Sequence, residues 1–479
     1  MDAQDLAHII RRRDFLRSAA GGVGIAALAS LMAGEGRAAN SLPEANPFGP
    51  KPPHFPGKAK NVIFLYMEGA PSQIDLLDPK PELQRRHGQP LPASMTKDLE
   101  LAFIKPSATI LASPRAFRRY GQSGAEFSDL LSAWAPIADE MCIVRSMYTE
   151  AFNHEPADRI LLTGHMLPGR PTMGSWVLYG LGREAKDLPG FIVLSTGKGN
   201  RSQSTVWTSG FLPSSYQGVM FRRTGDPVLY LSNPPSISVE EQRADFDLVR
   251  VLNREHNADT GDVEIASRIA SYEMAFRMQL STPELLDFSK EPAHIRESYG
   301  VDREPTRAFS TNCLLARRLV ERGVRFVMVT HSSWDHHSAL NKQLKENCDI
   351  TAGPIASLVQ DLKQRGMLSS TLVVWAGEFG RTAMGEFRRP EDAEYAGRDH
   401  HANGFSVWLA GGGIRPGVTL GRTDDLGLSI AEDPVHLNDL QATILHCLGF
   451  DHTRLTFRHL GRNFRLTDVL GKVVDKMLA

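Results

Sequence analysis

The sequence predicts a three-layer α/β sandwich with a largely parallel central sheet, and three observations support this fold class. Residues 60–67 form an unbroken apolar run, which is typical of a strand buried on both faces of a parallel sheet. Similar runs recur along the chain, and amphipathic helical patterns such as residues 311–322 and 350–365 lie between several of them. Strands that alternate with helices indicate this class. The other expected strands are residues 141–144, 191–194, 324–330, 371–376 and 405–410.

Composition sets the limits of the interpretation. A chain of 479 residues with 42% hydrophobic content can bury a large core, which excludes disorder as its main state. The formal net charge of −1 gives no electrostatic footprint for nucleic acid. The 4 cysteines are widely spaced and form no CxxC pair, so we expect buried thiols rather than metal ligands or a disulfide framework.

The N-terminal residues 1–38 have the pattern of a twin-arginine signal peptide. Residues 11–16 (RRRDFL) supply the arginine motif, and an Ala- and Gly-rich stretch, residues 18–34, follows it. A basic amphipathic helix is the alternative, and this composition disfavours it. The stretch is weakly apolar and marginal for a stable membrane span, and retention of the signal as a membrane anchor is the alternative. We therefore expect residues 39–479 to form the mature domain, periplasmic or extracellular, with no stable span.

Two short segments rich in carboxylates and imidazoles, residues 332–337 and 397–401, point to a divalent metal site. Zn²⁺ and similar cations bind imidazole nitrogen and carboxylate oxygen, and a catalytic site keeps one position open. One histidine pair alone is more often a surface or loop-capping feature. Two such clusters beside apolar runs favour the metal interpretation. The candidate ligands are Asp335, His337, His400 and His401.

Further polar side chains follow the same apolar runs. Glu68 comes directly after the first run, and Glu378 comes after the fifth. Asp335 and His337 follow the fourth run. Because ligands of open α/β sheets bind beyond the carboxyl ends of the strands, we expect one site built from these separated segments.

At these residues the chain resembles the alkaline phosphatase superfamily. Residues 61–69, an apolar strand followed by an acid and a glycine, resemble its first strand, in which the acid binds metal. Residues 372–380 are similar to the late strand of sulfatases and phosphatases that ends in an acid. His400-His401 and residues 405–410 resemble the last metal histidine and the strand behind it.

Within this superfamily the chain resembles a sulfatase-like bacterial family of unknown function, DUF-1501. The shared motifs are the twin-arginine signal and residues 69–75 (GAPSQID), 377–382 (GEFGRT) and 461–468 (GRNFRLTD). The resemblance covers nearly the whole mature chain. It implies an alkaline phosphatase-like fold with a metal site. The implied ligands are Glu68, Asp335, His337, Glu378 and His400 or His401.

Two positions depart from the superfamily pattern. His154 stands nine residues before Thr163 of a Leu-Thr-Gly turn, where sulfatases have a modified Cys or Ser. Imidazole can bind metal, act as a base or form a covalent intermediate, but it cannot form the sulfatase aldehyde hydrate. Phe379 stands where phosphatases have a His and sulfatases often an Asn. Without that ligand, either Glu68, His154 and Glu378 hold an ion at this second position or no ion binds at it.

Two arginines are candidate substrate contacts. Arg381 and Arg398 can grip a sulfate or phosphate in bidentate fashion, because a planar guanidinium fits a tetrahedral oxyanion. The alternative is that each is the partner of a buried acid, Glu378 or Asp399.

Four further features have mainly structural interpretations. Asp75 is equally a helix-terminus carboxylate or a ligand. Ser72 is more typical of a helix N-cap than of a nucleophile. Residues 411–413 (GGG) lack the spacing of a phosphate loop and predict a turn. His436, near an expected helix at residues 440–448, is expected to be structural.

The sequence thus predicts an exported, metal-dependent hydrolase of sulfate or phosphate esters. Its cofactor is a divalent cation, Zn²⁺, Ca²⁺ or Mn²⁺, and its partner a small-molecule or polysaccharide ester rather than nucleic acid. The competing hypothesis is a metal-stabilised, catalytically degenerate binding or scaffold protein of the cell envelope. The missing standard nucleophile is its main support.

Overall fold

The structure is a computed structural model, and it describes most of the residues that follow residue 48. The described residues are 49–92, 95, 101–105, 107–197, 203–222, 237–260, 274, 276–279, 282–387 and 395–479. The protein divides into two compact units, Met1–Pro47 and Phe48–Ala479. The expected signal peptide, residues 1–38, lies outside the described residues. All that follows concerns the second unit.

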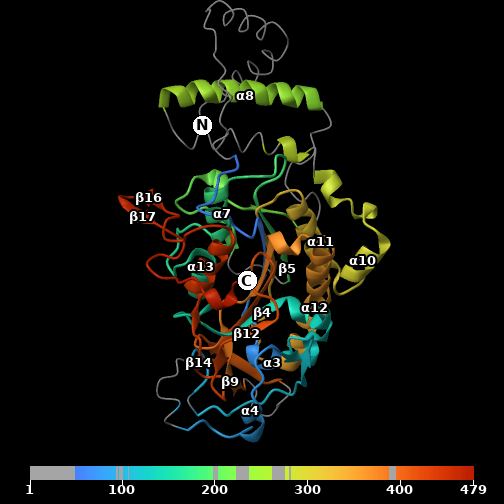
Figure 1. Cartoon of the computed structure of the whole chain (residues 1–479), viewed down its shortest axis with the longest axis vertical. Helices are drawn as coiled ribbons and strands as arrows, with labels where there is room; N and C mark the ends of the chain where they lie inside the picture. The colour runs from blue at the N-terminus through green and yellow to red at the C-terminus, as the bar shows by residue number, and fades with distance from the viewer. Residues whose placement is uncertain are drawn as a thin grey trace, which may run out of the picture. The chain divides into compact units, whose positions relative to one another are not determined.

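The centre of the second unit is a nine-stranded sheet with the order β12-β4-β11-β8-β1-β7-β5-β6, and β15 pairs with β4 (Figure 1). Neighbouring strands run parallel except at β11, which is antiparallel to both β4 and β8. The strands of the sheet are β1 (Asn61–Met67), β4 (Met141–Tyr148), β5 (Phe191–Thr196), β6 (Val219–Met220), β7 (Phe326–His331), β8 (Thr371–Ala376), β11 (Phe405–Ala410), β12 (Val418–Leu420) and β15 (Val435–His436).

Helices cover both faces of this sheet, so the unit has three layers. Strand β1 is buried throughout, and its side chains alternate between two hydrophobic cores. Ile63 and Leu65 pack on one face with α11 (Arg307–Glu321) and α12 (Leu340–Gln364). Val62 and Phe64 pack on the other face, beneath a second group of helices. That group is α6 (His154–Thr163), α7 (Met173–Leu181) and α13 (Leu437–Cys447).

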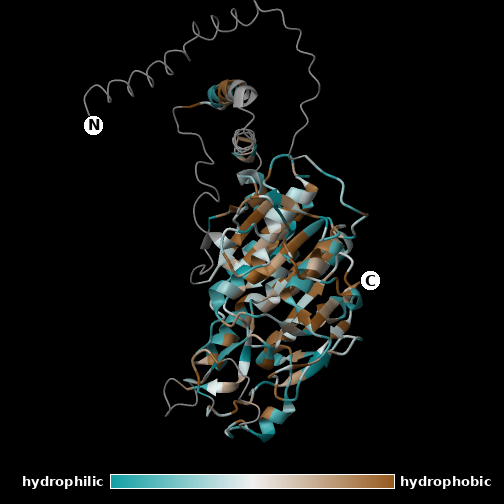
Figure 2. Cartoon of the chain, turned by 90° about the vertical axis from the view of Figure 1, so that its left-hand side faces the viewer, coloured by the Kyte–Doolittle hydropathy of each residue, from teal (hydrophilic) through white to brown (hydrophobic). Residues whose placement is uncertain are grey.

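The predicted fold class is confirmed: the unit is a mixed α/β structure with a large, mostly parallel central sheet. In Figure 2 its central strands are largely brown, the colour of hydrophobic residues. All six expected strands are present: β8 and β11 have the expected bounds, and β1, β5 and β7 differ by one or two residues at their ends. Strand β4 differs most, because it continues to Tyr148 beyond the expected residues 141–144. Further α-helices among the described residues include α3 (Gln73–Leu76), α4 (Pro81–Arg85), α8 (Val239–Thr260) and α10 (Ala293–Tyr299).

The single antiparallel strand decides which loops share an edge of the sheet. Phe405 at the start of β11 pairs with Met147 near the carboxyl end of β4. The residues just before β11 therefore reach the same edge as the residues that follow β1, β7 and β8. These residues form the second strand of a hairpin, β9 (Gly380–Glu386) with β10 (Gly397–His401).

Several smaller expectations are met. All four cysteines are buried and free. Residues 411–413 form a turn in which the three glycines have φ of 70°, 55° and 94°, values that favour glycine. His436 caps α13: its ring accepts a hydrogen bond from the Asn438 N–H, and Asp439 accepts one from the His436 N–H. None of the helices in the described ranges is both long and apolar enough to cross a bilayer.

Three short hairpins complete the strands of the described unit. They are β2 (Phe117–Tyr120) with β3 (Ala125–Ser128), β13 (Arg422–Thr423) with β14 (Ile430–Glu432), and β16 (Phe457–His459) with β17 (Arg462–Phe464).

Candidate metal centre

The loops after β1, β7 and β8 meet at the carboxyl edge of the sheet. Gly69 has φ of 111°, and a Cβ at this position would lie 2.7 Å from the Asp335 nitrogen. Only glycine allows the two loops to approach so closely. The loop after β8 joins them, because the Glu378 carboxylate accepts a hydrogen bond from the Gly69 N–H, with N–O distances of 3.0 and 3.2 Å. The sequence motif Glu68-Gly69 thus marks a required backbone contact.

Four side chains converge on one point at this edge. Their donor atoms lie within 4.8 Å of one another and belong to His154, Asp335, His337 and His400. The Asp335 Oδ1 atom is 3.1 Å from His154 Nε2, 2.9 Å from His337 Nε2 and 3.5 Å from His400 Nε2. One carboxylate and three imidazoles are a donor set that suits a divalent transition metal. We call these four residues the four-donor cluster.

The two histidines after β7 and in β10 are oriented by hydrogen bonds on their far side. His337 Nδ1 lies 2.5 Å from Glu386 Oε2, and His400 Nδ1 lies 2.7 Å from the Phe152 carbonyl oxygen. An Nδ1–H that donates to an oxygen leaves the Nε2 lone pair for a metal, which is the usual arrangement of metal-bound histidine. The residues present therefore fit a divalent cation.

His154 begins helix α6 and lies between two acids. Its Nδ1 is 2.6 Å from Glu378 Oε1, and its Nε2 faces Asp335. Burial lowers the pKa of His154, but hydrogen bonds to Asp335 and Glu378 outweigh it and raise the pKa to about 9. The Phe379 ring packs against His154 and His400, with centroid distances of 4.9 and 4.6 Å. Phe379 thus fills space beside the cluster with an apolar ring.

Glu68 and Glu378 lie beside the four-donor cluster rather than in it. Both are buried, as is Asp158 on α6, which accepts a hydrogen bond from the Tyr66 hydroxyl. Burial together with the negative charges of Asp158, Glu378 and Glu68 raises the pKa of Tyr66 well above its ordinary value. Three carboxylates therefore surround one phenol behind His154.

His400 and His401 are separated by the alternation of strand β10. Side chains of consecutive strand residues point to opposite faces, so only one of the two can face Asp335. The structure places His400 in the cluster and His401 on the other side. Burial lowers the pKa of His401 to about 4. The alternative that the sequence leaves open, His400 or His401, is therefore decided by position.

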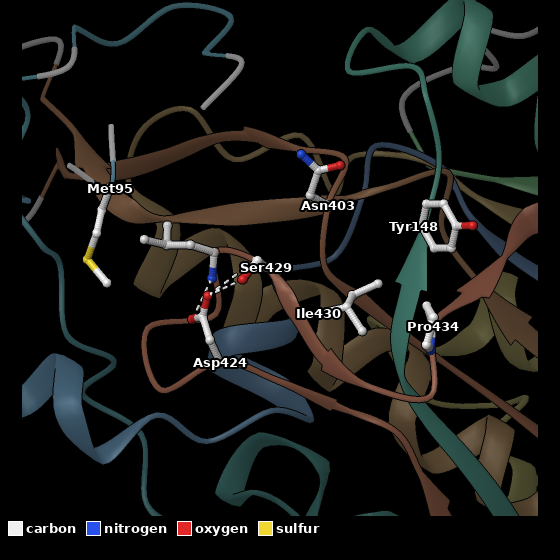
Figure 3. Close-up of a pocket in the computed structure, with 8 residues that line it drawn as sticks. Met95, Tyr148, Asn403, Asp424, Ser429, Ile430 and Pro434 are labelled. Carbon is white, nitrogen blue, oxygen red and sulfur yellow. Dashed lines mark hydrogen bonds between the residues drawn. The ribbon is translucent and has the colours of Figure 1, made fainter. Parts of the chain in front are cut away.

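On the His401 side a separate pocket of about 420 Å³ opens between the end of β4 and the loop after β13 (Figure 3). Tyr148 and Asn403 line it, together with Asp424 and Ser429. The Asp424 carboxylate is already engaged, because it accepts hydrogen bonds from the backbone of Ser429 and neighbouring residues. The pocket contains none of the predicted site residues.

Arg381 and Arg398 occupy the interior and have different partners from those expected. Arg381 Nη2 lies 2.7 Å from Asp335 Oδ1 and also donates to the Gly69 carbonyl oxygen, while Nε and Nη1 donate to the carbonyl oxygens of Ala70 and Arg398. Arg398 pairs with Asp75, at 2.8 Å. The buried acids that the sequence left open as partners, Glu378 and Asp399, are not the observed ones: Glu378 is bound by the Gly69 N–H and His154, and Asp399 by backbone N–H groups. Both guanidinium groups are fully buried.

Asp75 and Ser72 belong to this interior network. Asp75 pairs with Arg398 and accepts a hydrogen bond of 2.5 Å from the Ser72 hydroxyl. Burial raises the pKa of Asp75, but the charge of Arg398 and hydrogen bonds from Arg398, Ser72 and Ser113 together outweigh it and lower the pKa overall. Ser72 is the N-cap residue of α3, although its side chain bonds Asp75 rather than the helix backbone. Both side chains are structural in this arrangement.

Sequence reasoning missed two residues that shape the site, Glu386 and Phe103, and gave a third, Asp399, a different partner. Glu386 orients His337, and Asp399 holds a loop by accepting hydrogen bonds from three consecutive N–H groups, those of Ala102, Phe103 and Ile104. Phe103 itself lies against the rings of His337 and His400. Only Asp399 had a sequence signal, its position inside the second histidine cluster. The other two are brought in by folding.

The fold and the four-donor cluster define an α/β protein with a candidate His/Asp metal site at the carboxyl edge of its sheet. Residues 59–478 match the family described as "Protein of unknown function (DUF1501)", and the chain belongs to this family. The predicted family is confirmed. No curated protein matches the chain.

Solved structures with similar folds include sulfatases and phosphatases. The chain is similar to the lipoteichoic acid synthase LtaP from Listeria monocytogenes, with 10% identity over 85% of this chain and 76% of that one and a TM-score of 0.33. The PsFucS1 sulfatase from Pseudoalteromonas sp. is 12% identical over 82% of this chain and 68% of that one, with a TM-score of 0.35. The alkaline phosphatase from the Antarctic bacterium TAB5 is 13% identical over 76% of this chain and 94% of that one, with a TM-score of 0.28.

Proposed function

We propose that this protein is a metal-dependent hydrolase of sulfate or phosphate esters that works at the four-donor cluster. The observation that carries the proposal is the orientation of His337 and His400. Each has its Nδ1 engaged by an oxygen, and both Nε2 atoms face Asp335 and His154. A divalent cation held there supplies a Lewis acid toward an ester oxygen.

The cluster residues have distinct proposed roles. Asp335, His337 and His400 would hold the cation, because both imidazoles have their Nδ1 atoms engaged by an oxygen and their Nε2 atoms facing Asp335. His154 is either the fourth ligand or a proton carrier, and a covalent role at Nε2 is the least favoured. The Glu378 carboxylate beside His154 Nδ1 orients the ring and raises its basicity, which is what a base acting through Nε2 requires.

The donor set favours Zn²⁺ among the three candidate cations. Three imidazoles and one carboxylate suit Zn²⁺, whereas Ca²⁺ prefers an all-oxygen shell and Mn²⁺ is better matched by carboxylate and water. We therefore propose Zn²⁺ as the resident ion.

The proposed substrate is a small-molecule or polysaccharide ester outside the cytoplasm. The twin-arginine motif at residues 11–16 supports export, and that route carries folded proteins already loaded with metal. N-terminal sequencing of protein recovered from the periplasm is expected to begin close to residue 39. An intact N-terminus on cytoplasmic protein would remove the export proposal.

A second candidate is a metal-stabilised binding or scaffold protein that has lost its chemistry. The observation in its favour is the pair of departures next to the cluster. An imidazole, His154, occupies the nucleophile position that the resemblance implies, and the Phe379 ring packs where a ligand is expected.

The metal site is tested by substitution of its central carboxylate. Wild-type protein purified after growth with Zn²⁺, Mn²⁺ and Ca²⁺ is expected to contain about one divalent ion per chain by elemental analysis. Asp335→Ala removes the carboxylate that faces all three imidazoles, so its metal content is expected to fall close to zero. Asp349→Ala is the matched control, because Asp349 is an exposed acid paired with Lys345 on α12. Wild type without stoichiometric metal would end the proposal.

A panel of aryl sulfates, phosphate monoesters and phosphate diesters separates enzyme from scaffold. Turnover that is lost in Asp335→Ala and kept in Asp349→Ala supports hydrolysis at the cluster. Metal-loaded wild type that turns over none of these esters supports the binding protein instead. Turnover that survives His154→Ala unchanged would remove His154 from the mechanism.

A further inference from the structure

A loop that sequence reasoning did not single out is fastened directly onto the four-donor cluster. The Asp399 Oδ2 atom accepts hydrogen bonds from Ala102, Phe103 and Ile104, with N–O distances of 3.0, 2.8 and 3.1 Å. Its Oδ1 atom accepts the N–H of His400 at 2.8 Å. One buried carboxylate thus joins a cluster residue to the loop, which fixes the loop relative to the proposed cation.

Phe103 is the middle residue of this loop segment, and its ring lies against two cluster histidines. The ring centroids of Phe103 and His337 are 5.1 Å apart, and those of Phe103 and His400 are 5.4 Å apart. Both pairs are close to perpendicular, at 89° and 82°. Yet 60% of Phe103 is exposed. An apolar ring that remains this exposed beside a polar centre has surface left to bury against a bound molecule.

Two more exposed aromatic residues belong to segments that are joined to the same centre through neighbouring residues or the backbone. Among the residues that the structure describes, the exposed aromatic side chains are Phe103, Phe387 and Tyr395. Phe387 directly follows Glu386, the partner of His337. The carbonyl oxygen of Tyr395 accepts the Ala339 N–H at 3.1 Å, which holds Tyr395 next to the loop that follows His337.

We propose that the exposed ring of Phe103 is the binding site for the organic part of the substrate and contacts it directly. The substrate class is a sulfate or phosphate ester of a six-membered ring with an apolar face, which both aryl groups and pyranoses possess. Aromatic side chains pack favourably against such faces and place few constraints on the polar groups that the ring carries. This inference rests on the proposed function, and it adds which esters the site selects.

The first test measures binding and needs no turnover. Calorimetry with the zinc-loaded mature protein compares phenylphosphonate with methylphosphonate, which share the anion and differ in the ring. Wild type is expected to bind phenylphosphonate about tenfold more tightly, the scale of one aromatic contact. Phe103→Ala is expected to abolish most of this difference and leave methylphosphonate unchanged. Phe103→Leu keeps apolar bulk without a ring, so its preference for phenylphosphonate is expected to lie between those of the wild type and Phe103→Ala.

The matched control is Leu167→Ala. Leu167 is 61% exposed, close to the 60% of Phe103. It follows the C-terminal end of α6, whereas His154 begins that helix. It is expected to leave both affinities and the zinc content unchanged. Zinc content and thermal unfolding of the Phe103 variants show whether the cluster itself remains intact.

The second test measures kcat/KM on phenyl phosphate, glucose 1-phosphate and methyl phosphate. A selective loss in Phe103→Ala on phenyl phosphate alone assigns an aryl substrate, and a selective loss on glucose 1-phosphate assigns a pyranose. Equal losses on all three esters overturn the inference while the proposed function stands. Zinc-loaded wild type that binds neither phosphonate and turns over no ester overturns both the proposed function and this inference.

Discussion

Each histidine that faces Asp335 from β10 or the loop after β7 is held by an oxygen on its opposite side. For His337 that oxygen belongs to Glu386, and for His400 it is the Phe152 carbonyl. These contacts fix both the tautomer and the direction of the ring. At this scale, metal affinity depends on side chains that do not themselves contact the ion.

Glu386→Gln tests this dependence. The amide keeps the size of the side chain but removes the charge that polarises His337, so the dissociation constant for Zn²⁺ is expected to rise about 10- to 100-fold. Competition against a chromogenic chelator measures it. Glu432→Gln is the control, since Glu432 is an exposed acid paired with Arg422. Equal affinities in the wild type and Glu386→Gln would show that the contact does not tune the metal.

The neighbouring histidines of β10 provide a second residue-scale prediction. His400→Ala is expected to lose most of the bound metal because His400 Nε2 faces Asp335. His401→Ala is expected to keep it, since His401 points to the opposite face of the strand. Elemental analysis after dialysis compares the two proteins. A larger loss in His401→Ala than in His400→Ala would contradict the assignment.

At the scale of elements, the β9–β10 hairpin delivers the late half of the site. Glu386 ends β9 and pairs with Gly397 at the start of β10, and the register shifts between Arg398 and His400. Gly397 lies against the backbone of His337, where a Cβ would come within 2.1 Å of its carbonyl carbon. The hairpin can approach the loop after β7 only because this position has no side chain.

Gly397→Ala is therefore expected to be strongly unfavourable. The added carbon meets backbone, which cannot rotate away, so the free energy of unfolding is expected to fall by about 2–3 kcal/mol and the metal content with it. Urea unfolding measures the first quantity and elemental analysis the second. Gly353→Ala is the control: Gly353 lies within α12 with no atom near its hypothetical Cβ, and it is expected to gain up to about 1 kcal/mol.

At the scale of the whole molecule, two separate cores hold the sheet from both sides. Cys313 and Cys348 lie in the core with α11 and α12, whereas Cys142 and Cys447 lie in the core with α6, α7 and α13. The thiols therefore report on both layers independently. Their burial also agrees with the absence of any cysteine from the four-donor cluster.

Thiol labelling tests this three-layer packing. Burial raises the pKa of Cys142 and Cys447 to about 12, so at about pH 8 only roughly one thiol in ten thousand is ionised. The folded protein is expected to incorporate no iodoacetamide, and the protein in concentrated urea four equivalents. Mass spectrometry counts the labels. Rapid labelling of one pair in the folded protein would show that its helical layer opens.

The apolar runs made the class of fold predictable because a strand buried on both faces must be apolar at every position. The same reasoning placed Glu68, Asp335 and Glu378 at one edge, since parallel strands end together. The partners of Arg381 and Arg398 were not predictable, because those acids, Asp335 and Asp75, reach them only through folding. The long sequence interval between Phe103 and His400 likewise hides their contact.

The sequence by itself determined the layered α/β fold, the family and the edge of the sheet at which carboxylates and imidazoles gather. Only the tertiary structure decided that His400 rather than His401 faces Asp335, that Glu386 orients His337, and that Phe103 packs against both cluster histidines. The physical reason is the range of the forces involved. Apolar periodicity is written into neighbouring residues, whereas the direction of a side chain and its partner depend on segments that meet only after folding.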